Sequence, residues 1–527
     1  MNRLSRYILL IWVIVISYLF YVRFVLSPGE FNNFSFIDDG QHYQNSRLLS
    51  DCIRFKECSR FINEVFIEKQ FNRFRPFSWL AQGFMFEFSG YSASVLHLLR
   101  AYGLGLLLIL FLVSTLIFAQ TKTVFIIVAL CLFTLNRSFT ENIIRLGPVE
   151  PYQVIFLALF SILFLKKRYF IEKGFHKGLL NILIFLTLTS LILTKETSFV
   201  ILLPILFINQ FVSKDEEKTK TIYLLLPVLI FFAGRAAAFK ASEIYTLDYN
   251  LDVSAMLRNL VLYLGILSSI LGKFLIISGA SLIPFVLISK LRKTLLDKQF
   301  IYWILVSLAY LAILLPWKYV MDRYLLPVIF GLINVVFILL SRLTDFLKGE
   351  LGKQNFVTRR NYYFYSALLI ILISNIYFDA FTPNYARSQN YRNWYAMFNK
   401  FEGEQIATLL RFPDKDIYIN AKDILYNYEV FYELPIHFQY IYHQSPRMGR
   451  FTGVEHGYVL TRSYLEPAFT AEELDQLGYK EVASKRYSAE QINEGFFRNE
   501  FVANALVAIS SPPLGKPEEF FWEIRKK

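Results

Sequence analysis

Two adjacent aspartates, Asp38 and Asp39, follow shortly after an apolar stretch that is long enough to cross a membrane. They stand in the sequence FSFIDDGQHYQNSR, next to Gly40 and among aromatic residues. Carboxylates in such a place can act as general bases or as ligands of a divalent cation. Neighbouring side chains usually point apart, so we expect one aspartate to act while the other orients it. Asp-Asp-Gly is also common in turns, which leaves a purely structural role open.

Two glutamates stand in comparable places further along the chain. Glu141 belongs to NRSFTENIIRLGPVEPYQ and Glu196 to LTKETS, and each lies at or just beyond the end of an apolar run. Both can serve as general bases or metal ligands in the same way as the aspartates. A Lys-Glu pair such as Lys195 and Glu196 is also typical of a helix end, so the pair alone does not identify a site.

Basic residues stand near the same ends of the apolar runs. If they converge, they would hold an anion at the membrane surface, and arginine suits phosphate because its planar guanidinium donates two parallel hydrogen bonds. The natural ligand at that surface is a lipid phosphate. The alternative is that these side chains extend to lipid headgroups or pair with nearby acids. The residues are Arg73, Arg75, Arg137, Arg145, Lys195, Arg235, Lys240, Lys318 and Arg323.

The composition of the chain is that of a membrane protein. Of its 527 residues, 55% are apolar and 17% are aromatic. Runs of roughly 17 to 25 apolar residues match the length that an α-helix needs to cross the hydrocarbon of a bilayer. We count about eleven, which predicts an α-helical polytopic membrane fold. The runs cover residues 7–26, 94–119, 124–136, 152–165, 179–194, 199–212, 222–238, 272–289, 300–316, 325–340 and 362–381.

Lysine and arginine in the short loops predict the orientation. The start MNRLSR and the loops KKRYFIEKGFHK, SKDEEKTK, KLRKTLLDK and SRLTDFLKGELGKQNFVTRR all fall on one side, which the positive-inside rule assigns to the cytoplasm. We therefore expect a multi-pass protein of the inner (cytoplasmic) membrane with a cytoplasmic N-terminus and an uncleaved first run. The net charge of +13 then reflects topology, and no nucleic-acid partner is expected.

Two regions are expected outside the membrane on its outer face. The first outer loop, residues 27–93, carries the aspartate pair, and residues 382–527 follow the membrane domain, residues 1–381, as an extracytoplasmic α/β or α+β domain. DKDIYINA and GYVLTRSYL predict strands, and the threonine of TAEELDQLG predicts a capped helix. The segment FRPFSWLAQGFMFEFSGY is interpreted as an interfacial helix, although it also suits a core-packed helix. The segment DYNLDVSAMLRNLVLYLGILSSILG is interpreted as an interfacial or re-entrant element; if it crosses the membrane fully, residues 382–527 lie in the cytoplasm.

The three cysteines do not form a disulfide framework. Cys52 and Cys58 share the first outer loop, where an oxidising environment would allow a bridge, and two free thiols are an equal alternative. Cys131 lies within an apolar run and is expected to pack there.

Four short motifs, in this order, resemble segments of the protein O-mannosyltransferases and related bacterial glycosyltransferases of the GT-C superfamily. DDG precedes Arg75-Pro76 and an amphipathic segment that leads into a run opening with His97-Leu98. FTENIIRLGPVEPYQVIFLALFSILFLKKR is similar to the second outer loop and fourth span of these enzymes. LTKETSFVILLPILFI is similar to their Lys-Glu element, and DRYLLPVIFGLINVVFIL to their Arg-Tyr-Leu-x-Pro element. The resemblance covers residues 1–340, and no tetratricopeptide repeats follow.

The resemblance implies an inverting transfer of sugar from a polyprenyl phosphate to a glycan, lipid or protein acceptor on the outer face. It implies that Asp38 deprotonates the acceptor hydroxyl, with Asp39 in reserve. Membrane lipids surround the site, and no cofactor is expected; if a divalent cation is used, these two aspartates would hold it. Preorganised cations would stabilise the leaving phosphate, namely Lys195, Arg235 and Arg323 with Arg75 and Arg145 behind them. Orienting or hydroxyl-binding roles fall to Glu141, Glu196 and His97.

Two other classes of membrane protein remain as alternatives. A flippase or secondary transporter of lipid-linked sugars would concentrate ionisable residues near the bilayer midplane and often show duplicated halves. This chain places its charges at one face. A polymerase or ligase of cell-envelope glycans would share the substrate and the compartment, but the early DDG and Arg-Pro elements favour the GT-C class.

Overall fold

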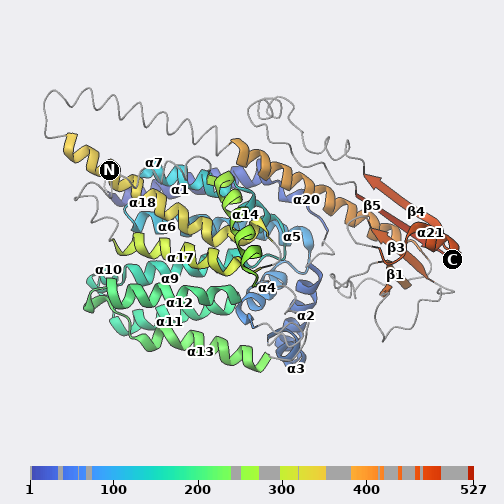
Figure 1. Ribbon diagram of the computed structural model, residues 1–527, viewed down its shortest axis with the longest axis horizontal. Coiled ribbons are helices and arrows are strands. Elements are labelled where there is room, and N and C mark those ends of the chain that lie inside the picture. The colour runs from blue at the N-terminus through green and yellow to red at the C-terminus, as the bar shows by residue number, and fades with distance from the viewer. Residues whose placement is uncertain are drawn as a thin grey trace.

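The computed structural model is mainly helical, with one small sheet near the C-terminus (Figure 1). Asp38 and the side chain of Asp39 lie outside its described part. The described residues are 3–33, 39–56, 58–66, 74–238, 251–271, 297–317, 320–351, 382–412, 416–420, 437–441, 457–462, 467–487 and 520–527.

The helices account for most of the described chain. The α-helices are α1 (Arg3–Tyr21), α2 (Asp39–Phe55), α3 (Cys58–Arg60), α4 (Pro76–Phe88), α5 (Ala93–Leu98), α6 (Gly105–Phe118), α7 (Thr123–Thr134), α8 (Arg137–Ile144), α9 (Glu150–Leu165), α10 (Lys167–Glu172), α11 (Lys177–Thr194), α12 (Leu202–Phe207), α13 (Thr221–Ala238), α14 (Val253–Leu271), α17 (Lys298–Leu314), α18 (Leu326–Leu351), α20 (Thr382–Leu409) and α21 (Ala471–Gln476). Short 3₁₀ or π turns extend or join them at η1 (Val22–Leu26), η2 (Pro28–Glu30), η3 (Phe61–Phe66), η4 (Leu99–Leu104), η5 (Glu196–Ile201), η6 (Ile208–Val212), η7 (Asp215–Glu217) and η9 (Asp322–Leu325).

Helix starts follow local sequence signals. The Asn136 side chain accepts a hydrogen bond from the Phe139 N–H and caps α8, and Asp297 caps α17 in the same way through the Gln299 N–H. Proline occupies the first turn of α4 and of α9, where its missing N–H costs no hydrogen bond. Residues at the starts of α4 and α9 later form part of the candidate site.

The described helices are those of a multi-pass membrane protein. Four of them are long and apolar enough to cross a bilayer, or five if α7 and α8, bent by 63°, count as one broken span. Shorter apolar helices accompany them, and the expected number of about eleven spans stays a prediction. Every expected run that falls on described residues coincides with helix, and runs 272–289 and 362–381 lie outside these residues. The four long segments are Tyr7–Glu30, Ala93–Phe118, Lys177–Thr194 and Asp322–Asp345.

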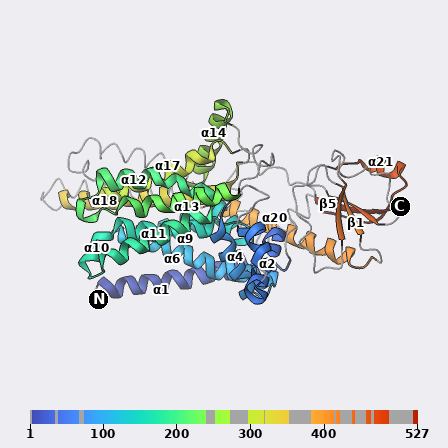
Figure 2. The same cartoon turned by 90° about the horizontal axis from the view of Figure 1, so that it is seen from below.

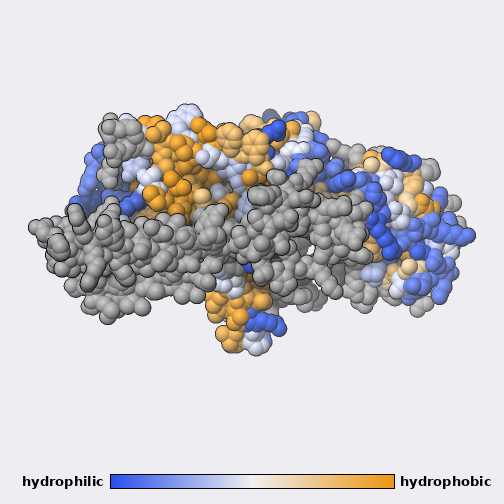
Figure 3. Space-filling model, turned by 90° about the horizontal axis from the view of Figure 1, so that it is seen from above, coloured by the Kyte–Doolittle hydropathy of each residue, from blue (hydrophilic) through white to orange (hydrophobic). Residues whose placement is uncertain are grey.

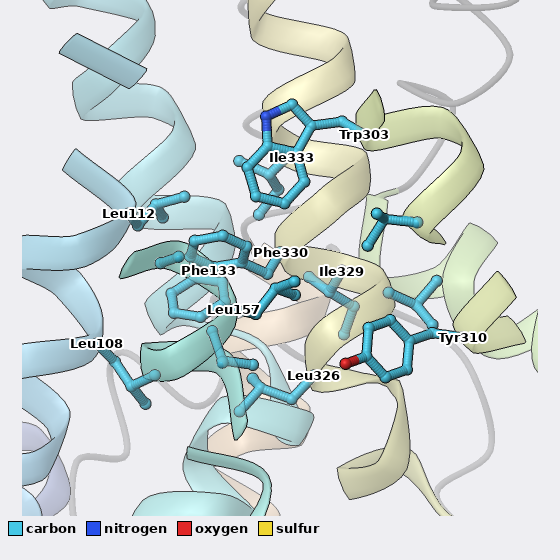
Figure 4. Close-up of a cluster of buried hydrophobic side chains, with 14 of the residues drawn as sticks. Leu108, Leu112, Phe133, Leu157, Trp303, Tyr310, Leu326, Ile329, Phe330 and Ile333 are labelled. Atoms are coloured by element: carbon cyan, nitrogen blue, oxygen red, sulfur yellow. The ribbon is translucent and has the colours of Figure 1, made fainter. Parts of the chain in front are cut away.

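The core of the bundle lies between α6, α7, α9, α17 and α18 (Figure 4). The ring of Phe330 on α18 lies 6.0 Å from that of Phe133 and 5.6 Å from that of Trp303. Leu112 and Leu157 are fully buried beside them. Hydrophobic residues also cover much of the visible bundle surface, whereas hydrophilic residues are frequent at the end with the sheet (Figure 3). Apolar surface on both sides of a helix is expected where lipid replaces water.

One end of the bundle gathers the loops that were assigned to the cytoplasm. Lys167 is buried, and its Nζ donates to the Asn181 Oδ1 at 2.7 Å and to the Lys218 carbonyl at 2.9 Å. Lys298 at the start of α17 pairs with Glu217 at 3.2 Å. The N-terminus and α10 lie at this end, while α2 and α4 lie at the other (Figures 1 and 2). The described parts of these loops therefore lie at one end of the bundle, and the side of the membrane that this end faces stays a prediction.

Helices α2 and α4 pack closely at the other end. A methyl group on Gly83 of α4 would overlap the Leu49 side chain of α2, so any larger residue would require Leu49 to move. The aromatic residues of α4 divide between core and surface, because Trp79 and Phe86 are buried while Phe84 is 53% exposed. The helix is therefore partly core-packed, which was the alternative to an interfacial helix.

A disulfide joins the end of α2 to α3. Cys52 and Cys58 are bonded, with their Cα atoms 4.3 Å apart. The sequence allowed a bridge or two free thiols, and the structure contains the bridge. Cys131 on α7 is a free, partly buried cysteine.

We expect protein isolated without reductant and then denatured to react with iodoacetamide at Cys131 but not at Cys52 or Cys58. Reduction should make all three reactive and lower the free energy of unfolding by about 2 kcal/mol, because the closed loop is short. Mass spectrometry of the alkylated peptides measures this directly, with Cys131 as the internal control. Alkylation of Cys52 before reduction would contradict the bridge.

The C-terminal sheet has the strand order β2-β1-β3-β5-β4. Strands β1 (Asp416–Asn420), β2 (His437–Ile441) and β3 (Tyr458–Arg462) are parallel, and β5 (Phe520–Lys526) and β4 (Lys480–Tyr487) continue the sheet antiparallel. Thr470 and Glu473 form a capping box at the start of α21. The predicted strands at β1 and β3 and the predicted helix α21 are confirmed, and the mixed sheet is of an α/β or α+β kind.

Helix α20 runs from the bundle to the sheet (Figure 1). Tyr391 and Tyr395 in its middle are buried in the bundle core. Phe398 and Phe401, further along, are buried against Leu460 and the other core residues of the sheet. The two hydrophobic cores therefore share one helix.

Candidate active site

An open cavity lies where the ends of several helices meet, away from the end that holds α10. It has about 800 Å³ of empty space, with open solvent at its mouth included. Its lining residues come from α2 (His42), the start of α4 (Arg75), the turn into α9 (Gly147, Pro148, Val149 and Glu150), the start of η5 (Lys195, Glu196 and Thr197), the end of α17 (Ile313, Leu314 and Trp317) and η9 (Arg323 and Tyr324).

An ion pair stands in the wall of this cavity. The Nζ of Lys195 lies 2.5 Å from the Oε1 of Glu150, and the two side chains are 13% and 3% exposed. The same Nζ lies 4.3 Å from the centre of the Tyr324 ring, within the range of a cation–π interaction. Lys195 is therefore held by a carboxylate and a ring at once, with its charge at the cavity.

Two arginines add positive charge to the same wall. The Arg323 guanidinium lies 5.2 Å from the centre of the Tyr324 ring, on which Lys195 also rests. The Arg75 guanidinium lies 5.0 Å from the ring of Trp79, and the imidazole of His42 lies 5.0 Å from that same ring. Trp79 is 2% exposed, so it fixes two polar side chains from two helices beside the cavity.

Buried polar side chains hold the backbone that carries these groups. Arg100 on η4 donates to the Asn142 carbonyl at 2.7 Å and to the Pro148 carbonyl at 3.0 Å. Gln82 donates to the Gly147 carbonyl at 3.0 Å, and Asn142 donates to the Arg323 carbonyl at 3.0 Å. These bonds satisfy carbonyls in the last turn of α8, in the turn before α9 and in η9, and together they fix the backbone around the cavity.

Four of the predicted site residues line the cavity: Arg75, Lys195, Glu196 and Arg323. They come from three distant stretches of the sequence, so their convergence could not be deduced from spacing. Tyr324, next to Arg323, also lines the cavity and was not predicted as a site residue.

The other predicted residues occupy different places. Glu141 of α8 and Arg145 just after it form an ion pair at 3.4 Å. They do not line the cavity, but they flank Asn142, which donates to the Arg323 carbonyl. Arg235 lies near the end of α13 and is not among the lining residues; its neighbour Gly234 touches the ring of Phe74, one residue before Arg75.

His97 lies in the core. It is fully buried, and its Nδ1 lies 2.9 Å from the Ile144 carbonyl. The side chains of Asp38 and Asp39, like Arg73, Lys240 and Lys318, lie outside the described residues. His42, however, is only three residues after Asp39 and lines the cavity, so the start of α2 is at the cavity.

Among the lining residues that were not predicted, His42, Glu150 and Tyr324 carry side chains that can bind or exchange protons. Glu150 carried a readable signal, because it is an acidic residue before Pro151 at the start of an apolar run, where a helix N-terminus favours a negative charge. Its burial beside Lys195 depends on α11 and could not be read from the sequence.

Among the described residues, no group of three or more histidine, cysteine, aspartate or glutamate side chains could hold a metal ion. Asp38 and Asp39, the expected ligands, do not belong to that part of the chain.

Comparisons with known proteins found similar structures but no similar sequences. No protein-family model matches the chain, and no curated protein matches it. The chain is similar to the crystal structure of ArnT from Cupriavidus metallidurans in the apo state, with 11% identity and a TM-score of 0.49 over 92% of this chain and 97% of that one. It is also similar to the structure of that protein bound to undecaprenyl phosphate, with 11% identity and a TM-score of 0.49 over 91% and 96% of the two chains.

Proposed function

We propose that the protein is an inverting membrane glycosyltransferase of the GT-C type, which moves a sugar from a polyprenyl-phosphate donor to a hydroxyl of a glycan, lipid or protein acceptor. The observation that carries this proposal is the convergence of Arg75, Lys195 and Arg323 on one cavity at the end of an apolar helical bundle. A lipid phosphate needs both parts of this arrangement, because its head is charged and its tail is apolar.

The cations suit the phosphate of the donor and of the leaving group. Three of them face two carboxylates, Glu150 and Glu196, so the wall carries an excess of positive charge. Lys195 is preorganised by Glu150 and the Tyr324 ring. Charge fixed in advance, in a site with little water, stabilises a developing phosphate without reorganisation at the moment of reaction.

The remaining lining residues suit the other parts of the substrates. Ile313, Leu314 and Trp317 form an apolar side of the cavity, which matches the first isoprene units of the donor. Trp317 and Tyr324 can also stack on a sugar ring, and their own rings lie 6.3 Å apart. Glu196, at the start of η5, is placed to accept hydrogen bonds from sugar hydroxyls.

The base is proposed to be Asp38, with Asp39 as the second candidate. The chain brackets this pair between Asn33 and the cavity residue His42. The proposal rests on sequence position, because Asp38 stands four residues before His42 and four residues of chain span at most about 14 Å. In the proposed step the carboxylate takes the proton of the acceptor hydroxyl, whose oxygen attacks the anomeric carbon while the bond to the polyprenyl phosphate breaks.

The proposed location is the outer face of the cytoplasmic membrane. The positive loops cluster at the end with α10, and the cavity lies at the other end of the bundle. This assignment also puts the disulfide and the sheet on the oxidising side. If a divalent cation is used, Asp38 and Asp39 are proposed as its ligands, and the cation would supply further charge at the donor phosphate.

Replacing Arg323 with alanine is expected to weaken donor binding by about ten- to a hundredfold, the value of charge-assisted hydrogen bonds, with a smaller effect on kcat. Binding of undecaprenyl phosphate, the lipid held in one of the similar ArnT structures, measures this for the purified protein. The matched control is Arg168→Ala, since Arg168 is an exposed arginine on α10 at the opposite end. Equal binding by wild type and Arg323→Ala would contradict the assignment of the phosphate site.

A further inference from the structure

The segment before the aspartate pair is held by α20, a helix more than 350 residues later in the chain. The Asn399 Oδ1 accepts hydrogen bonds from the Asn32 N–H at 3.0 Å and the Asn33 N–H at 3.1 Å. Its Nδ2 donates to the Asn33 carbonyl at 2.5 Å, and the Asn33 Nδ2 donates to the Asn399 carbonyl at 3.2 Å. The Asn399 side chain thus supplies the backbone of Asn32 and Asn33 with hydrogen-bond partners of the kind that a neighbouring strand would offer.

Arg392 fixes the same segment two turns earlier on α20. Its Nε donates to the Leu26 carbonyl at 3.0 Å, and its Nη2 pairs with Glu30 at 2.7 Å. Phe31, which is fully buried, lies with its ring centre 5.3 Å from those of His97 and Tyr395. His97 therefore packs on this segment and supports it.

The same helix also holds the cavity side that carries Arg323. The Thr140 hydroxyl of α8 is hydrogen-bonded to the Ser388 hydroxyl of α20. The Arg137 guanidinium lies 5.1 Å from the centre of the Tyr391 ring and pairs with Asp322 of η9 at 3.4 Å. Helix α20 thus contacts the segment that leads to Asp38 and the supports of the turn that contains Arg323.

We infer that α20 is a strap that sets the position of the aspartate pair relative to the phosphate site, and that Asn399 and Arg392 are positioning residues. Asn33 is five residues before Asp38 in the sequence, so the place of Asn33 limits how far the proposed base can lie from the held segment. The inference about turnover rests on the proposed function, whereas the strap itself does not. Because Phe398 and Phe401 anchor α20 in the sheet core, the C-terminal domain is a structural part of the site.

Two substitutions test the strap by opposite physical routes. Asn399→Leu removes the hydrogen bonds to Asn32 and Asn33 and keeps a side chain of similar size. Gly403→Ala leaves the Asn399 side chain in place, but the added methyl group would overlap the side-chain amide of Asn33. Alanine is also the better helix former, so this variant should not destabilise α20 itself. The matched control is Lys400→Ala, since Lys400 lies beside Asn399 and pairs only loosely with Glu404, at 3.9 Å.

The first readout is hydrogen exchange of the Asn32 and Asn33 amides in the full-length protein. We expect exchange at least tenfold faster in Asn399→Leu and Gly403→Ala, and unchanged exchange in Lys400→Ala. The second readout is steady-state transfer, where we expect kcat to fall about ten- to a hundredfold with the KM for donor within twofold, as for a misplaced catalytic group.

The outcomes separate the two claims. Unchanged exchange in both variants would overturn the hold of α20 on the segment. Unchanged kcat in variants whose exchange has risen would overturn its role in positioning the base. Faster exchange in the variants of a protein that transfers no sugar even as wild type would support the strap and remove the proposed function.

Discussion

Replacing Asp38 with asparagine is expected to lower kcat for sugar transfer by about 10²- to 10⁴-fold, the usual contribution of a general base. Asparagine has nearly the same shape but cannot take a proton from the acceptor hydroxyl. The KM for the polyprenyl donor should change little, because the phosphate is assigned to Arg75, Lys195 and Arg323. Initial rates of transfer by the purified variant, with its thermal unfolding compared to wild type, measure both parts of the expectation.

The matched control for this experiment is Asp39→Asn. We expect a smaller loss, because the proposal gives Asp39 an orienting role. Loss confined to Asp39→Asn would exchange the two roles, and wild-type activity from both variants would remove the proposed base.

Replacing Lys195 with methionine is expected to lower kcat/KM by about 10²- to 10³-fold, similar to the loss of one preorganised charge or donor in other active sites. It should also lower the free energy of unfolding by about 3 kcal/mol, because Glu150 is left buried without its partner. Thermal and denaturant unfolding measure the second effect separately from the first.

The double variant Lys195→Met with Glu150→Gln separates catalysis from folding. Neutral glutamine removes the buried unpaired charge, so we expect stability to recover towards the wild-type value while transfer stays low. Recovery of transfer together with stability would mean that Lys195 serves only as the partner of Glu150, and the phosphate role would then fall to Arg75 and Arg323.

The sequence allowed the membrane helices to be predicted well, because a bilayer imposes length and apolarity on each helix by itself. It also separated the two ends of the bundle, since charge in short loops is a local property. Strands β1 and β3 were predicted from short apolar patterns, whereas β4 and β5 were not. Their pairing, with a bulge between Glu481 and Ala483, joins segments about 40 residues apart and has no local signal.

The candidate site was predicted in part, and the limit has a physical cause. Residue type singled out Arg75, Lys195 and Arg323, because the predicted orientation leaves few cations at that end of the helices. The same signal also selected Arg235 and Arg145, which are not among the lining residues. Glu150 and Tyr324 were missed, because their roles come from contacts with Lys195 on another helix. The bonds of Asn399 to Asn33 could not be foreseen either, since an asparagine in the middle of a polar helix has no feature that points to a distant partner.

The proposed reaction breaks the bond between a sugar and a polyprenyl phosphate. It can be followed with a radiolabelled polyprenyl-phosphate sugar in vesicles that contain the purified wild-type protein and cell-envelope extract as acceptor. We expect label to appear in acceptor molecules while polyprenyl phosphate is released in equal amount. Intact labelled donor after incubation, with or without movement across the vesicle membrane, would rule out sugar transfer and favour a flippase or transporter.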